Sequence, residues 1–225
     1  MKNLSFLTTN LIAHRGLHDQ NNPENSMGAF KQAVLKNYGI ELDVHITKDK
    51  KVVVFHDDHL KRMTGDHRYI KDCTYQELLK LKLGDSSYRI PLLSEVLAFV
   101  HGKVPIIIEL KRDQKIGVLE KEVIKILDSY SGFFAVKSFR VSSVLWFRLI
   151  RKHYVRGQLA NHPISLLVNW LIQPDFISYN VKNLPNKWIA KYKKKKIVLG
   201  FTVQSKEELK RVLGYCNNFI CEHFI

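Results

Sequence analysis

The sequence has little cysteine and lacks a long hydrophobic run, and both shortages narrow the class of protein. Its cysteines, Cys73, Cys216 and Cys221, are odd in number and match no metal-binding or redox spacing. We therefore expect a reduced, cytoplasmic setting. The longest apolar run, residues 164–172, is interrupted by Asn169 and is too short to cross a bilayer. The first apolar stretch runs directly into a His-Arg pair at position 14, so we expect no signal peptide.

Acidic residues are also scarce. The chain has 21 Asp and Glu against 36 Lys and Arg, a net charge of +15. This excess predicts an anionic partner: a phosphate compound, nucleic acid or an anionic membrane surface. Only the net charge favours nucleic acid, without basic residues interleaved with aromatic ones, so we expect no nucleic-acid partner. Hydrophobic residues make up 45% of the 225, enough for a full core, and no linker or repeat divides residues 1–225, which predicts one domain.

Short β-branched runs alternate with helical periodicity along most of the chain. The expected strands are 9–14, 40–46, 104–110, 133–139, 155–160, 175–179, 197–203 and 219–222. The expected helices begin near residue 25 or 26, at 75–83, after a Ser94 cap, and at 117–127, 142–152, 163–172, 185–193 and 206–213. Eight strands joined through helices predict an α/β fold, the TIM (β/α)8 barrel, which typically has about 250 residues. The alternative is an open, doubly wound sheet.

An extra run at 52–55 follows the second strand after only five residues. Because that gap cannot hold a helix, we expect an antiparallel β-hairpin arm, followed by a small polar insertion at 58–90. A two-residue turn at Asp49–Lys50 would place Asp43 directly opposite His56.

Two carboxylates in the second strand, Glu41 and Asp43, alternate with apolar neighbours and so share one face. This face could be solvated. In a barrel it would instead lie in the interior or at the mouth, where carboxylates need a partner such as a cation.

An ordered set of short motifs runs through the first half of the chain. The motifs are His14-Arg15-Gly16, Pro23-Glu24-Asn25-Ser26, Glu41-Leu42-Asp43-Val44, Thr47-Lys48-Asp49, Val53-Val54-Phe55-His56-Asp57 and Ile108-Glu109-Leu110-Lys111. With these motifs the chain resembles the glycerophosphodiester phosphodiesterases. The match is densest over residues 11–65, returns at 90–111 and is thin afterwards. The resemblance implies a TIM barrel that hydrolyses glycerophosphodiesters to an alcohol and glycerol 3-phosphate in lipid and glycerol metabolism.

The resemblance also implies roles for individual residues. Glu41, Asp43 and Glu109 would hold one divalent cation, Mg²⁺ or Ca²⁺, because hard cations prefer oxygen ligands. His14 and His56 would be the catalytic acid and base, in an order left open, because histidine titrates near neutral pH. The glycerol 2-hydroxyl would attack phosphorus, and water would then open a cyclic phosphate.

Other positions would bind or support the substrate. Arg15 and Lys111 would hold the phosphate and Phe201 would form an aromatic wall of the site. Asn25 is expected to contact the residues of the site without touching the substrate.

Two stretches depart from the family pattern, and the burial of two further segments can be predicted. Lys50 stands where members have glycine, so we expect a lysine at positive φ. Cys221-Glu222-His223 replaces small residues and an aspartate near the last strand. Trp188 and Tyr192, four residues apart, are expected in the core, and the run at 193–196 is expected to be a solvated helix end.

Two other functions stay open. One is a phospholipase D- or C-like enzyme on intact lipids, in which the basic charge and the 164–172 helix make weak contact with an anionic membrane surface. The other is a catalytically silent barrel that binds a phosphate ligand. The complete set of histidines and carboxylates argues against the silent barrel.

Overall fold

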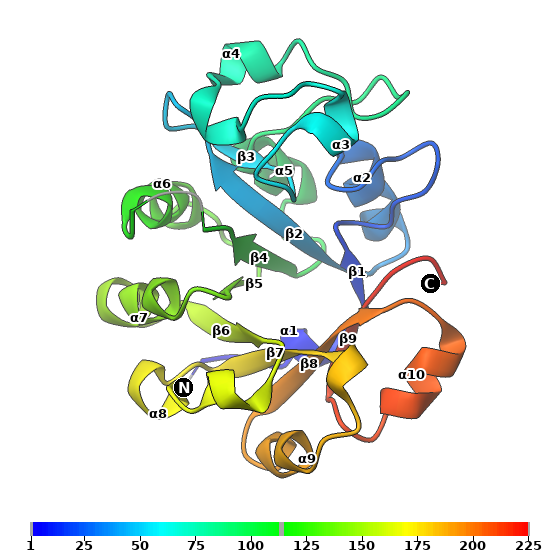
Figure 1. Ribbon diagram of the computed structural model, residues 1–225, viewed down its shortest axis with the longest axis vertical. Helices are drawn as coiled ribbons and strands as arrows, with labels where there is room; N and C mark the ends of the chain where they lie inside the picture. The colour runs from blue at the N-terminus through cyan, green and yellow to red at the C-terminus, as the bar shows by residue number, and fades with distance from the viewer. Residues whose placement is uncertain (1, 113–114, 225) are drawn as a thin grey trace.

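The computed structural model describes residues 2–112 and 115–224, and its centre is a closed barrel of eight parallel strands (Figure 1). The strands are β1 (Ile12–His14), β2 (Gly39–Ile46), β4 (Ile106–Leu110), β5 (Phe134–Ser138), β6 (Val155–Ala160), β7 (Phe176–Asn180), β8 (Ile197–Val203) and β9 (Asn218–Cys221). β1 pairs in parallel with both β2 and β9, and this pairing closes the barrel. The expected TIM barrel is confirmed, and the open sheet is wrong.

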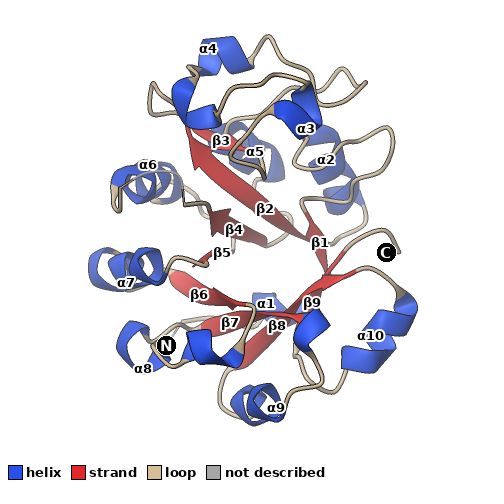
Figure 2. Cartoon of the chain, viewed as in Figure 1, coloured by secondary structure: helices blue, strands red, loops and turns tan. Residues whose placement is uncertain are grey.

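Helices surround the barrel in the connections between strands, except for the first helix, which precedes β1 (Figure 2). They are α1 (Phe6–Thr9), α2 (Met27–Leu35), α3 (Lys61–Thr64), α4 (Tyr75–Leu78), α5 (Leu93–Val100), α6 (Val118–Leu127), α7 (Val141–Ile150), α8 (Asn169–Ile172), α9 (Lys187–Lys193) and α10 (Lys206–Val212), with 3₁₀ turns η1 (Ile70–Asp72), η2 (Pro163–Leu166) and η3 (Val181–Asn183). α2 begins as expected, because the Ser26 side chain accepts a hydrogen bond from the Ala29 amide.

Some predicted elements were wrong in detail. The helical turn α1 occupies the start of the expected first strand, and α4 is one turn long. Ser94 does not cap α5, because the preceding Leu92 is the N-cap and its amide donates to the Glu95 carboxylate at 2.8 Å. Trp188 is 71% exposed, so its assignment to the core was wrong. Across the described residues, no helix has the length and apolarity needed to cross a membrane.

The hairpin arm is present, but its register differs from the predicted one. β3 (Val52–Val54) runs antiparallel to the second half of β2 and pairs Val44 with Val54. The Thr47 amide donates to the Lys51 carbonyl at 2.9 Å, so the turn has three residues. Lys50 ends this turn at φ 61°, as expected for the position of a bulge. The additional turn residue shifts the pairing by one position.

This shift changes the neighbour of Asp43. Its carbonyl accepts from the amide of Phe55 at 3.0 Å, so Phe55 is the opposing residue and the predicted pairing with His56 was wrong. His56 follows Phe55 directly at the end of the arm. The insertion beyond it packs around its own small core of Val53, Phe55, Leu60, Ile70, Cys73, Tyr75, Leu78, Leu83 and Ile90.

The barrel interior is divided into an apolar layer and a polar layer. The apolar layer joins one side chain from each barrel strand except β2 with two from α1: Phe6, Leu7, Ile12, Ile107, Ala135, Val155, Phe176, Leu199 and Ile220. Because side chains alternate along a strand, the position two residues later points to the same face. In six strands that position carries His14, Glu109, Lys137, Ser178, Phe201 or Glu222. The site is therefore built on the carboxyl-terminal side of an apolar floor.

Candidate active site

Three buried carboxylates meet in the polar layer. Glu41 and Asp43 come from β2 and Glu109 comes from β4, where it lies directly beside Asp43 in the parallel register. One oxygen of each carboxylate lies within 4.8 Å of the others. Hard oxygen donors at this spacing fit a divalent cation such as Mg²⁺ or Ca²⁺. The predicted ligand set is thus brought together.

Two lysines balance these carboxylates. The Lys111 ammonium lies 2.7 Å from Asp43 Oδ1 and 2.8 Å from Glu109 Oε1. The Lys137 ammonium lies 2.8 Å from Glu41 Oε1 and 3.5 Å from Glu109 Oε2. Burial would raise the pKa of Asp43, but the charges of Lys111 and its other cationic neighbours hold that pKa well below its usual range. The Asp43 carboxylate is therefore held in its charged form.

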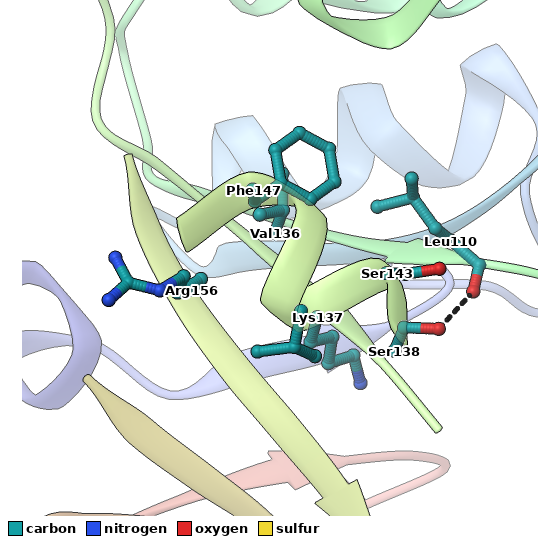
Figure 3. Close-up of a pocket in the computed structure, with 8 residues that line it drawn as sticks. Leu110, Val136, Lys137, Ser138, Ser143, Phe147 and Arg156 are labelled. Atoms are coloured by element: carbon teal, nitrogen blue, oxygen red, sulfur yellow. Dashed lines mark hydrogen bonds between the residues drawn. The ribbon is translucent and has the colours of Figure 1, made fainter. Parts of the chain in front are cut away.

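Lys137 was missing from the predicted site. It is 2% exposed and lies on β5, where the parallel register places it beside Glu109. Figure 3 shows it next to Ser138, whose hydroxyl donates to the Leu110 carbonyl oxygen at 2.8 Å. The neighbouring residue Val136 faces the opposite side of the strand and packs in the outer core. Side chains alternate between the two faces of β5, so the apolar Val136 on the outer face could have indicated that Lys137 points inward.

Arg15 and Asn25 both contact Asp43. The Arg15 Nε lies 3.4 Å from Asp43 Oδ2, and the Asn25 side-chain amide donates to the same oxygen at 3.1 Å. The Arg15 backbone amide also donates to Glu41 at 3.2 Å. Asn25 thus contacts a predicted cation ligand directly, while the Arg15 guanidinium is already paired with carboxylates.

His14 is oriented by Glu222, a residue that the predicted site left out. Its Nδ1 lies 2.5 Å from Glu222 Oε2. Burial would raise the pKa of Glu222, but the hydrogen bond and charge of His14 outweigh it and lower the pKa to about 2. The only sequence signal was that Glu222 departs from the family pattern beside the last strand.

An open cleft adjoins His14. It has a volume of about 270 Å³ and is lined by His14, Arg15, Asn180, Lys182, Phe201, Thr202, Gln204 and Glu222. The Phe201 ring contacts Phe139 edge to face, with centroids 6.0 Å apart. Phe201 therefore forms part of an aromatic wall, and Lys182 adds a cation that was not predicted.

His56 is held by a chain of charged contacts. Its Nδ1 lies 2.6 Å from Asp57 Oδ1, and Asp57 accepts from Arg62 Nε at 2.6 Å. Arg62 also donates to Glu24 at 2.7 Å, and Glu24 accepts from Arg15 at 2.8 Å. The chain links the insertion to the loop after β1. Both histidines thus contact a carboxylate through Nδ1.

The fold and the site define a barrel enzyme whose histidines and clustered carboxylates lie at the carboxyl ends of the strands. Residues 14–224 match the family model described as the glycerophosphoryl diester phosphodiesterase family. The chain therefore belongs to that family, which is a family of phosphodiester hydrolases.

Individual relatives agree with this assignment. A glycerophosphodiester phosphodiesterase from Bacillus altitudinis is 32% identical over 239 residues, covering 91% of this chain and 90% of the relative. Human lysophospholipase D GDPD1 is 41% identical over 134 residues, covering 53% of this chain and 41% of that protein. The fold is similar to that of an Oleispira antarctica phosphodiesterase solved with its product sn-glycerol-3-phosphate, with a TM-score of 0.88, 20% identity and coverage of 96% and 93%.

The contacts of Asp57 predict an acid-sensitive contribution to stability. Burial would raise the pKa of Asp57, but Arg62 and His56 lower it to about 2. Because the folded pKa lies below the unfolded value of about 3.9, this stabilisation is present above about pH 4 and is lost as the pH falls through about 2. Arg62→Gln should therefore lose less unfolding free energy than wild type between about pH 5 and pH 3 in urea titrations.

A matched variant tests the assignment to Arg62. Lys61→Gln removes one positive charge from the same helical turn and should keep the wild-type difference between the two pH values. An unchanged pH dependence in Arg62→Gln would mean that Arg62 does not set the pKa of Asp57.

Proposed function

We propose that the chain hydrolyses glycerophosphodiesters to an alcohol and glycerol 3-phosphate, with one divalent cation held by Glu41, Asp43 and Glu109. The observation that carries this proposal is the buried group of three carboxylates, whose oxygens lie within 4.8 Å of one another beside two carboxylate-paired histidines. Family membership supports the same reaction. Glycerophospholipid breakdown in the cytoplasm belongs to this proposal, supported by three cysteines that are buried free thiols.

A bound Mg²⁺ or Ca²⁺ would supply positive charge to a phosphate oxygen and lower the pKa of the glycerol 2-hydroxyl. The protein supplies the remaining groups. Lys111, 14% exposed at its side chain, lies beside the carboxylates, and Arg15 lies on the wall of the cleft. Both can meet the negative charge of the phosphate.

His14 and His56 divide the acid and base roles. Glu222 and Asp57 each contact Nδ1 of one histidine, so the proton moved during the reaction is carried by Nε2. One histidine takes the proton of the 2-hydroxyl as that oxygen attacks phosphorus, and the other gives a proton to the departing alcohol. Water then opens the resulting cyclic phosphate, and the proton transfers run in reverse.

Hydrolysis of glycerophosphocholine, measured by a coupled assay for glycerol 3-phosphate, tests the function. We expect activity that is lost in excess EDTA and restored by Mg²⁺ or Ca²⁺. Glu41→Ala, Asp43→Ala and Glu109→Ala should each abolish it, because each removes a ligand. Glu207→Ala, which removes an exposed carboxylate on α10, is the control and should keep full activity. Undiminished hydrolysis in excess chelator would overturn the cation requirement.

The nucleophile can be identified separately. His14→Ala and His56→Ala should each lower kcat by about 10²–10⁴-fold, with KM changed far less, because the phosphate-binding groups remain. A 2-deoxy diester should be turned over as poorly by wild type, because it lacks the attacking hydroxyl. Rapid turnover of this analogue would show that water is the nucleophile and would reassign the histidines.

A second candidate substrate is a lysophospholipid at a membrane surface. The connection between β6 and β7 exposes apolar side chains, with Ile164 at 72%, Leu167 at 60% and Trp170 at 77% exposure. A relative named lysophospholipase D matches half of the chain. Exposed apolar side chains on a protein of net charge +15 suit an anionic interface.

Vesicle binding tests this second candidate. Ile164→Ser with Trp170→Ser should weaken binding to anionic phosphatidylglycerol vesicles by about tenfold in co-sedimentation, because buried apolar area drives interfacial binding. Hydrolysis of soluble glycerophosphocholine should stay unchanged. Leu35→Ser on α2, which removes another exposed apolar side chain, is the matched control. Equal vesicle binding by all three proteins would contradict a membrane role for this connection.

A further inference from the structure

Each carboxylate of the proposed cation site already contacts a cationic side chain of the protein. Asp43 contacts Lys111 and Arg15, and Glu109 contacts Lys111 and Lys137. Glu41 has its closest cationic contact, at 2.8 Å, with the Lys137 ammonium. A divalent cation that binds these oxygens must therefore enter a site whose negative charge is already partly neutralised.

Lys137 differs from Lys111 in its freedom to move away. Lys111 lies just beyond the end of β4 and its side chain is 14% exposed, so it is partly open to solvent. Lys137 lies inside β5 and its side chain is 2% exposed. The parallel pairing of β4 with β5 fixes it beside Glu109. A buried ammonium must stay paired, because removing it from water without a partner is costly.

We infer that Lys137 is a built-in counter-cation that competes with the divalent cation for Glu41 and Glu109. This inference rests on the proposed function, in which these carboxylates are ligands. The ammonium and a metal ion cannot both contact the same Glu41 oxygen closely without strong repulsion between like charges. Lys137 therefore lowers the affinity for the divalent cation, and it keeps the carboxylates neutralised when no metal ion is bound.

The surroundings of Lys137 also provide an alternative contact for its ammonium. Nζ lies 5.6 Å from the centroid of the Phe201 ring, over the face of the ring. A cation at this distance is attracted by the aromatic quadrupole. When the ammonium is displaced from Glu41 it can keep this contact, at a side chain that also lines the cleft. The exchange needs a side-chain movement and no change in the barrel.

The test compares cation binding and stability in Lys137→Met, Lys137→Gln and wild type. Mn²⁺ affinity is measured from the signal of free Mn²⁺ in electron paramagnetic resonance, with Mg²⁺ and Ca²⁺ as competitors. Both variants should bind Mn²⁺ at least about tenfold more tightly than wild type, because the competing charge is gone. In EDTA both should unfold at a lower temperature than wild type, and saturating metal should raise their Tm by more than it raises that of wild type.

Lys125→Met on α6 is the matched control, because it removes the same charge from a side chain that is 68% exposed. It should leave both Mn²⁺ affinity and the response to EDTA unchanged. If Lys137→Met fails to fold in EDTA, binding is measured on Lys137→Gln and on protein refolded with metal. Unchanged or weaker Mn²⁺ binding in both variants would overturn the role of Lys137 alone. Absence of Mn²⁺ binding to wild type and both variants would overturn the cation site itself, and with it this inference.

Discussion

Charge neutralisation inside the barrel is the constraint on which the site depends. Glu41 and Asp43 are each 1% exposed, and buried carboxylates are stable in the charged form only when cations or hydrogen-bond donors surround them. The sheet positions one of those cations by register, because Glu109 lies beside Asp43 and Lys137 lies beside Glu109. Backbone pairing between strands therefore sets the relative positions of Asp43, Glu109 and Lys137.

The same register places the side chains that stabilise the barrel and the side chains of the site in two separate layers. One inward layer is apolar and is closed from below by α1, and the layer two residues further on is polar. Alternation with a period of two lets one strand contribute to both layers, as Ile107 and Glu109 do in β4. The apolar layer stabilises the barrel through burial, so the polar layer can carry charges that cost stability.

The sequence predicted the barrel and most of the site for different reasons. Strand patterning marked the eight strands, and local spacing placed Glu41 and Asp43 on one face. The spacing could not set the length of the turn that ends at Lys50, because two-residue and three-residue turns both fit the five residues between the strands. The predicted register with His56 was therefore wrong by one residue. Lys137 and Glu222 were left out because their importance comes from neighbours on other strands. Those contacts depend on how the barrel closes, which no local pattern specifies.

The two histidines depend on different parts of this architecture. Glu222 follows β9, and β9 pairs with β1, so the orientation of His14 follows from the last step of barrel closure. His56 instead depends on Asp57 and on Arg62 in the insertion, through contacts that are partly open to solvent. Exposed ion pairs are weak and easily broken, whereas strand pairing is held cooperatively. The position of His14 is therefore held by strand pairing, whereas the side chain of His56 is held by ion pairs with the insertion.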